Sequence, residues 1–226
     1  MAAADTPPDT LRIGSMLLPP WGQTDNQGRN SGVIYELNEE IGRRSGLHFT
    51  NEILPFGRMI ENLKQGRLDL VSSQAHWSAR AAGDRLGVQF TIDVMVAVRK
   101  NSGIETIEDL QGKDLVYHHA ASYPQLEGLS RSIFRVNSYE QSVRMLIRRP
   151  EFDGIVLTAP SFRYWTRQLG RQPSEFKTIP LEINKKQWIL VAKDMPQETR
   201  TKIKRAVDEI YQSDLYERLL DKHNLH

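Results

Sequence analysis

The fold follows from the stretch Phe56-Gly-Arg-Met-Ile-Glu-Asn-Leu-Lys-Gln-Gly-Arg-Leu-Asp-Leu-Val-Ser-Ser-Gln-Ala-His-Trp-Ser-Ala-Arg80. Its first apolar residues recur at helical spacing, and Gly66 is placed to end that helix in a left-handed turn. Leu68–Ser73 then reads as a buried strand, and a polar, aromatic and basic run follows it directly. Ligands of open α/β sheets bind beyond the carboxyl ends of the strands, so this run is the first candidate for a binding site.

The composition is that of an ordinary globular protein, with 39% hydrophobic and 26% charged residues. Thirty Lys and Arg against 28 Asp and Glu leave a net charge of +2, which argues against a nucleic-acid partner. The absence of cysteine excludes disulfides and thiolate metal sites. No apolar run approaches the roughly 18 to 20 residues of a membrane span.

The first nine residues, Met-Ala-Ala-Ala-Asp-Thr-Pro-Pro-Asp, carry neither the basic region nor the apolar stretch of a signal peptide. An alanine run before a polar, proline-rich lead is typical of the region around a signal-peptidase site. We therefore expect a mature, exported, periplasmic protein whose signal peptide is absent from this sequence.

Strands and helices are expected to alternate along the whole chain, as in parallel sheets. A first β-α-β-α-β unit is followed by a long β-rich run, a second set of alternating elements, one more strand and a final helix. The expected strands are 11–17, 47–54, 68–73, 88–99, 114–118, 132–136, 152–158, 176–181 and 187–193. The main helices are expected at 32–45, after 56, after 122, after 138, at 160–169 and after 196, with Ser138 and Gln141 as a capping box. This order indicates two α/β lobes joined by extended crossings near residues 97–101 and 186–191.

Several ordered motifs resemble one known family, the type II periplasmic solute-binding proteins, in particular the receptors for polar amino acids (bacterial extracellular solute-binding family 3). The motifs are Leu11-Arg-Ile-Gly with Pro19-Pro-Trp21, the helix after Gly32 with Glu36, Leu63-Lys-Gln-Gly-Arg-Leu-Asp69, Ile107-Glu-Asp-Leu-Gln-Gly-Lys113 and Phe152-Asp-Gly-Ile-Val156. The last three are similar to the family's "LxxGxxD", "DLxGK" and "DAVV" patterns. The resemblance covers the chain from Leu11 to about Leu220.

The resemblance implies two Rossmann-like lobes joined by a two-strand hinge, with residues 11–98 and 190–226 in lobe 1 and residues 99–189 in lobe 2. It implies a monomer without cofactor that captures a small carboxylate-bearing ligand between the lobes and delivers it to the membrane permease of an ABC importer. The ligand is expected to be either amino-acid-like or an amine-free organic anion.

Two arginines of lobe 1 are candidates for holding the ligand carboxylate, because a guanidinium bonds both oxygens at once. Arg80 lies near the place where amino-acid receptors have such an arginine, one residue closer to Asp69 than expected. Arg58 stands at a helix start, where a cation is disfavoured, which indicates another partner. Arg80 is alternatively a solvated surface arginine, and Arg58 is alternatively one partner of a salt bridge to a surface carboxylate. Aromatic and polar residues expected to line the pocket are Trp21, Phe56, Gln74, His76 and Trp77.

In lobe 2 the resemblance places ligand-binding N–H groups at Ser122 and Tyr123, where Ala121-Ser122 replaces the usual Gly-Thr or Gly-Ser. Thr158 stands where amino-acid receptors have an aspartate for the ligand's ammonium group. A buried ammonium without a carboxylate is costly, so an amine-free ligand is favoured unless Glu182, Asp93 or another acid substitutes.

Adjacent histidines fall at positions 118 and 119. They would face opposite sides of a strand, so no metal site is expected there.

Three other functions remain open at this point. A soluble partner of a membrane sensor protein uses the same fold. A cyclohexadienyl dehydratase would need an acid in the cleft, and the run from Gln74 to Arg80 holds none. The effector half of a LysR-type regulator would need a helix-turn-helix that the residues before Leu11 do not supply. We therefore expect no enzymatic activity.

Overall fold

The computed structural model describes residues 10–74 and 77–226, except for the side chain of Trp77. Two compact units share the chain: unit 1 holds residues up to 90 and 186–219, and unit 2 holds residues 91–185 and 220–226. The predicted lobe bounds, 98/99 and 189/190, stay a prediction. The divisions fall inside two long strands, β6 (Asp84–Arg99) and β10 (Phe176–Val191), where the sequence offers no break.

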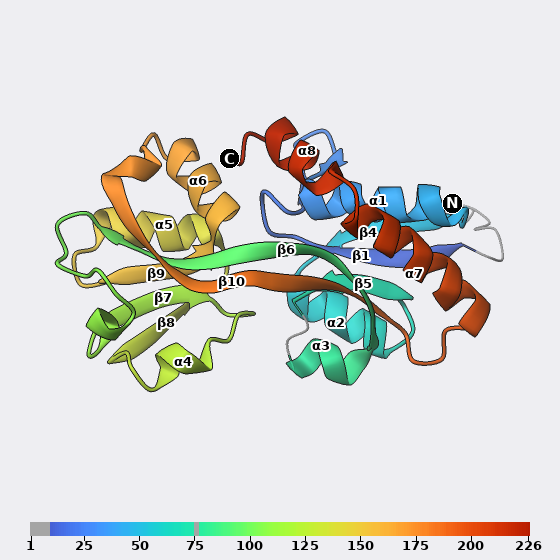
Figure 1. Cartoon of the computed structure of the whole chain (residues 1–226), viewed down its shortest axis with the longest axis horizontal. Coiled ribbons are helices and arrows are strands. Elements are labelled where there is room, and N and C mark those ends of the chain that lie inside the picture. The colour runs from blue at the N-terminus through green and yellow to red at the C-terminus, as the bar shows by residue number, and fades with distance from the viewer. Residues whose placement is uncertain (1–9, 75–76) are drawn as a thin grey trace. The chain divides into compact units, whose positions relative to one another are not determined.

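Unit 1 is built on three parallel strands, with β10 added antiparallel to the third. The strands are β1 (Leu11–Met16), β4 (Phe49–Leu54) and β5 (Leu70–Ser73), beside a small hairpin of β2 (Gln23–Thr24) and β3 (Asn30–Ser31). The helices are α1 (Val33–Ser45), α2 (Phe56–Lys64), α3 (Trp77–Ala82) and α7 (Gln197–Tyr211). Helix α1 packs on β1, β4 and α7 (Figure 1).

Burial explains why the opening stretch folds as it does. Met59 and Leu63 point from α2 into a core shared with Val71 of β5, and all three are at most 2% exposed. Gly66 has a φ of 67°, so the helix ends in the predicted left-handed turn. Every residue of β5 is buried, because the strand lies between β1 and β10.

Unit 2 repeats the pattern with β7 (Asp114–His118), β8 (Ser132–Val136) and β9 (Gly154–Thr158), which run parallel, while β6 pairs antiparallel to β9. Its helices are α4 (Pro124–Glu127), α5 (Tyr139–Arg148) and α6 (Ala159–Gln168), with 3₁₀ turns η1 (Glu108–Leu110) and η2 (Pro173–Glu175). The Ser138 hydroxyl accepts the N–H of Gln141 at 3.1 Å, which confirms the predicted cap of α5.

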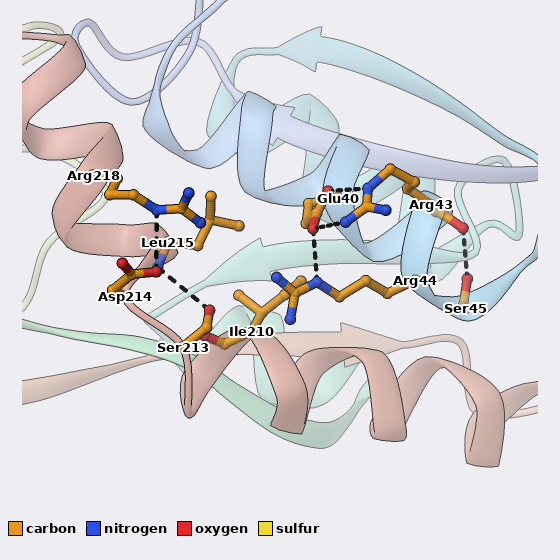
Figure 2. A network of polar contacts seen from close by, with 10 residues as sticks. Glu40, Arg43, Arg44, Ser45, Ile210, Ser213, Asp214, Leu215 and Arg218 are labelled. Atoms are coloured by element: carbon orange, nitrogen blue, oxygen red, sulfur yellow. Dashed lines mark hydrogen bonds and ion pairs between the residues drawn. The ribbon is translucent and has the colours of Figure 1, made fainter.

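Helix α8 (Leu215–Lys222) follows α7 after a sharp corner, where one continuous helix was expected. Figure 2 shows that corner: the Ser213 hydroxyl donates to the Ile210 carbonyl and accepts the N–H of Leu215, and Asp214 pairs with Arg218. No helix of the described residues combines the length and apolar character that crossing a membrane requires.

Figure 2 also shows the end of α1, where the Glu40 carboxylate forms ion pairs with the guanidinium groups of both Arg43 and Arg44. These hydrogen bonds, the one from Arg43 above all, lower the pKa of Glu40 from its usual value to about 2. Basic residues in a last helical turn also complement the helix dipole, so this end of α1 is doubly stabilised.

One sequence prediction about the strands was wrong in extent. The stretches 176–181 and 187–193 were expected as separate strands, but β10 runs unbroken through the polar residues between them. The prediction also named no helix in the run 74–80, where Trp77 begins the six-residue helix α3.

Candidate functional site

In unit 1 the predicted site segments follow the carboxyl ends of three neighbouring parallel strands. Strand β1 pairs with β4 in the register Met16 opposite Leu54, and with β5 through Gly14 opposite Val71. The loop that carries Trp21, the start of α2 with Phe56 and Arg58, and Gln74 therefore come from one edge of the sheet. This is the edge at which open α/β sheets bind ligands.

Arg58 and Arg80 differ from most arginines near them, because neither has an ion-pair or hydrogen-bond partner among residues 10–74 and 78–226. Both side chains are exposed. Elsewhere in unit 1, Arg12 pairs with Asp69 at 3.1 Å, and Arg85 lies over the Trp188 ring at 4.8 Å. A partnerless guanidinium is available to a carboxylate.

The two arginines have opposite relations to their helices. Arg80 lies in the last turn of α3, where the helix dipole favours a cation. Arg58 lies in the first turn of α2, which holds no acidic residue to offset it. Neither the helix dipole nor an acidic residue of this turn stabilises the charge of Arg58.

The aromatic candidates of unit 1 differ in how far their side chains are buried. Trp21 is 4% exposed and stacks on Phe90 with ring centroids 5.9 Å apart, and Phe90 stacks in turn on Tyr216 at 4.4 Å. Phe56 is only half-buried and packs on the core of unit 1. His76 and the Trp77 side chain lie outside the described residues.

In unit 2 the turn after β7 and the end of β9 lie at one sheet edge, because these strands pair in parallel with Tyr117 opposite Val156. Ser122 is half-buried in that turn. Tyr123 is 1% exposed and precedes α4, a helix of only four residues that begins with Pro124. The expected row of N–H groups at a longer helix start is therefore reduced, since proline has no N–H.

Thr158, the last residue of β9, is 2% exposed, and its hydroxyl donates to the Ser161 hydroxyl at 2.7 Å. The two acids that might replace the missing aspartate are both engaged. Asp93 accepts the N–H of Asn184 at 2.9 Å, and Glu182 pairs with Lys185. Unit 2 therefore presents no free carboxylate at these three positions.

The two adjacent histidines correct a sequence prediction. Strand β7 ends at His118, so His119 lies beyond the pleat, and the two rings lie beside each other with centroids 4.4 Å apart and their planes tilted by 33°, instead of facing opposite sides. His118 Nε2 donates to the Asn137 carbonyl at 3.0 Å, and its Nδ1 accepts the N–H of Ala120 at 3.1 Å. Burial, followed by repulsion from His119, lowers the pKa of His118 from 6.5 to about 4.

No group of three or more metal-ligating side chains occurs among the described residues. Sequence reasoning missed the contact of Lys185 with Tyr123, whose ring centroid lies 4.6 Å from the ammonium nitrogen. Positions 123 and 185 are too distant along the chain for any spacing to reveal it.

The comparison with protein families identifies the class of protein to which this two-unit α/β fold belongs. The chain belongs to the bacterial extracellular solute-binding proteins, family 3, whose pattern matches residues 11–226. This is a family of solute-binding proteins, and a relative described below is named for an ABC transporter. The match confirms the resemblance drawn from the motifs.

Individual relatives are distant. PatH of Vibrio harveyi, named as an amino-acid ABC transporter-binding protein, is 21% identical over 81% of this chain and 76% of its own. An ancestral arginine-binding protein bound to arginine is 20% identical with a TM-score of 0.76, over 95% of this chain and 97% of that one. The GluR0 ligand-binding core with L-glutamate reaches a TM-score of 0.78 at 12% identity, over 99% and 100% of the two chains. These structures confirm the fold class.

Proposed function

We propose that this protein is an extracytoplasmic receptor that captures a small, carboxylate-bearing organic anion without a free amine and delivers it to the permease of an ABC importer. The family and the name of its Vibrio relative support transport over a sensor role. The observation that carries the ligand class is Thr158: a buried threonine bonded to Ser161 stands where amino-acid receptors have their ammonium-binding aspartate.

The proposed carboxylate anchor is Arg80, with Arg58 as the alternative, because both guanidinium groups are exposed and have no partner among the described residues. Ser122 and Tyr123 are proposed as contacts in unit 2, at the same sheet edge as Thr158. Phe56 and Gln74 are proposed to cover the ligand from unit 1. Trp21 supports this edge from the core, since its ring is buried against Phe90.

A matched-pair thermal-shift screen tests the proposal. Each α-amino acid is compared with its 2-hydroxy and unsubstituted acid analogues, so that only the amine differs. We expect stabilisation by an amine-free acid and little by its amino-acid partner. Stabilisation by amino acids alone contradicts the ligand class. No stabilisation by any acid contradicts the receptor function.

Three arginine variants locate the anchor once an acid is found. Arg80→Ala is expected to weaken binding about 100-fold, as for loss of a charge-assisted pair. Arg67→Ala is the control, because the side chain of this exposed arginine of the same stretch donates a hydrogen bond to the Asn62 side chain at 3.0 Å. If Arg80→Ala retains affinity and Arg58→Ala loses it, the anchor is Arg58.

The reciprocal change is Thr158→Asp, which restores the carboxylate of the amino-acid receptors. We expect this variant to gain affinity for an amino acid relative to its amine-free analogue. Thr158→Asn, of equal size without the charge, is the control. An unchanged preference in the aspartate variant contradicts the role assigned to position 158.

A further inference from the structure

Lys185, Glu182 and Tyr123 of unit 2 form a small cluster that resembles an occupied ammonium site. The ammonium nitrogen of Lys185 lies 4.6 Å from the centroid of the Tyr123 ring and pairs with Glu182 Oε2. The other carboxylate oxygen of Glu182 accepts a 3.3 Å hydrogen bond from Gln125 Nε2. An aromatic face beside a carboxylate is the combination that binds organic ammonium groups.

The cluster is sheltered enough for these contacts to matter. Tyr123 is 1% exposed, and Glu182 Oε2 is shielded from solvent. The side chains of Lys185 and Glu182 are 21% and 28% exposed, so the cluster is open at one side. Cation–π contacts gain strength as the cation loses water, which distinguishes this lysine from one on an open surface.

The backbone is shaped to bring Lys185 to Glu182. Residues three apart in a regular strand face opposite sides of the sheet, so this pair could not meet along an ideal β10. Asn184, between them, has a φ of 54°, a left-handed conformation that asparagine tolerates better than most residues. Its N–H is held by Asp93 Oδ1 at 2.9 Å. An unusual backbone conformation fixed in this way is often found at functional positions.

We propose that Lys185 is a specificity-determining residue that occupies an ammonium subsite with its own side chain and so excludes ligands bearing an amine. This deepens the proposed function and rests on it, because Tyr123 belongs to the turn proposed to contact the ligand. A ligand ammonium would have to displace Lys185 from both the ring and the carboxylate. Without the lysine, the subsite accepts a small primary alkylammonium ion.

Chemical rescue with n-propylammonium tests this inference, because that ion reproduces the three carbons and the charge that Lys185→Ala removes from the lysine side chain. We expect this variant to bind the probe at least about tenfold more tightly than the unaltered protein. Binding is measured by titration calorimetry and by the rise in melting temperature, with neutral n-propanol as the control compound.

Three further variants make the test specific. Lys186→Ala removes the same charge one residue away and is expected to gain nothing. Lys185→Met keeps the stem and leaves no room for the probe. Glu182→Gln combined with Lys185→Ala removes the carboxylate and is expected to lose the gained affinity. Equal binding by the Lys186 variant, or binding that survives the loss of Glu182, overturns the inference.

If Lys185→Ala is unfolded by itself, refolding is measured with n-propylammonium and with n-propanol. Recovery with the cation alone is the expected result, and recovery with neither compound overturns the inference. No carboxylate ligand enters this experiment. The proposed function can therefore fail in the matched-pair screen while the rescue succeeds, and the reverse outcome is equally distinct.

Discussion

Acidification is expected to destabilise this protein through His118 before its carboxylates begin to titrate. The ring is 4% exposed, donates from Nε2 to Asn137 and accepts the N–H of Ala120 at Nδ1. Protonation would place a hydrogen on Nδ1, so it would break the bond to Ala120 and set a charge beside His119. The folded protein therefore resists protonation, and the pKa of His118 is lowered from 6.5 to about 4.

The sign and the magnitude follow from this difference. The unfolded chain binds the proton as the pH falls through 6.5, while the folded chain binds it only near pH 4. Stability is thus fully present above pH 6.5 and is lost between pH 6.5 and 4. A pKa difference of about 2.5, from 6.5 minus 4, corresponds to roughly 3 kcal/mol. Glu40 and Asp114, whose pKa values are lowered from 4.5 and 3.8 to about 2, lose their contributions mainly at lower pH, as the pH falls from those ordinary values toward 2.

The assay is the free energy of unfolding in urea at pH 7, 5.5 and 4, compared between the unaltered protein and His118→Asn. The asparagine oxygen can still accept the Ala120 N–H, but the side chain does not titrate. We expect the variant to be less stable at pH 7 and to close most of that gap by pH 4. His48→Asn, at an exposed position in unit 1, is the control. A difference between protein and His118 variant that stays constant from pH 7 to 4 refutes the reasoning.

Three further changes test the fold by urea denaturation. Gly32→Ala is expected to cost several kcal/mol, because φ is 123° and the new Cβ would lie 2.6 Å from the Trp21 carbonyl oxygen; Gly28→Ala, at positive φ in open space, is the milder control. Ser138→Ala is expected to cost about 1 kcal/mol by removing the cap of α5, and an unchanged midpoint would contradict that role. Asn38→Leu is expected to cost about 3 kcal/mol, since it leaves buried partners unpaired, and a neutral effect would contradict the network described below.

The buried polar network of unit 1 explains the last of these expectations. Asn38 Nδ2 donates to the Ser15 hydroxyl at 2.8 Å, and its carbonyl oxygen accepts from Gln89 Nε2 at 2.9 Å. The Ser72 hydroxyl donates to Gln89 and accepts from Gln187 Nε2 at 2.9 Å. The network thus joins α1, β1 and β5 to the unit 1 ends of β6 and β10.

Local signals predicted the elements that local chemistry determines. The left-handed turn at Gly66 and the cap at Ser138 were readable because each depends on residues within a few positions. Strand β10 was divided in the prediction because its polar middle, with Ile183 58% exposed, interrupts the apolar run while backbone pairing continues. Helix α3 has only six residues, too few to establish a helical period.

Long-range packing set the limit on predicting the site. The sequence marks Trp21 as an aromatic beside a loop, but only the fold brings Phe90 against it. The sequence marks Glu182 as a possible acid for an amine, but only the fold shows Lys185 paired with it. In both cases the residue type was recognised, and the partner that decides its role lies far along the chain or in an irregular strand.

Two separate features of unit 2 support the proposed ligand without a free amine. Thr158 lacks the carboxylate that an ammonium needs, and its hydroxyl is committed to Ser161. The remaining carboxylate beside an aromatic face, Glu182, is neutralised by a lysine held in place through the left-handed backbone at Asn184. Because one feature is a missing acid and the other an added cation, a single substitution should not convert the protein into an amino-acid receptor. The double variant Thr158→Asp with Lys185→Ala is therefore expected to bind amino acids more tightly than either single variant. If the two gains in binding free energy simply add, the two positions act independently.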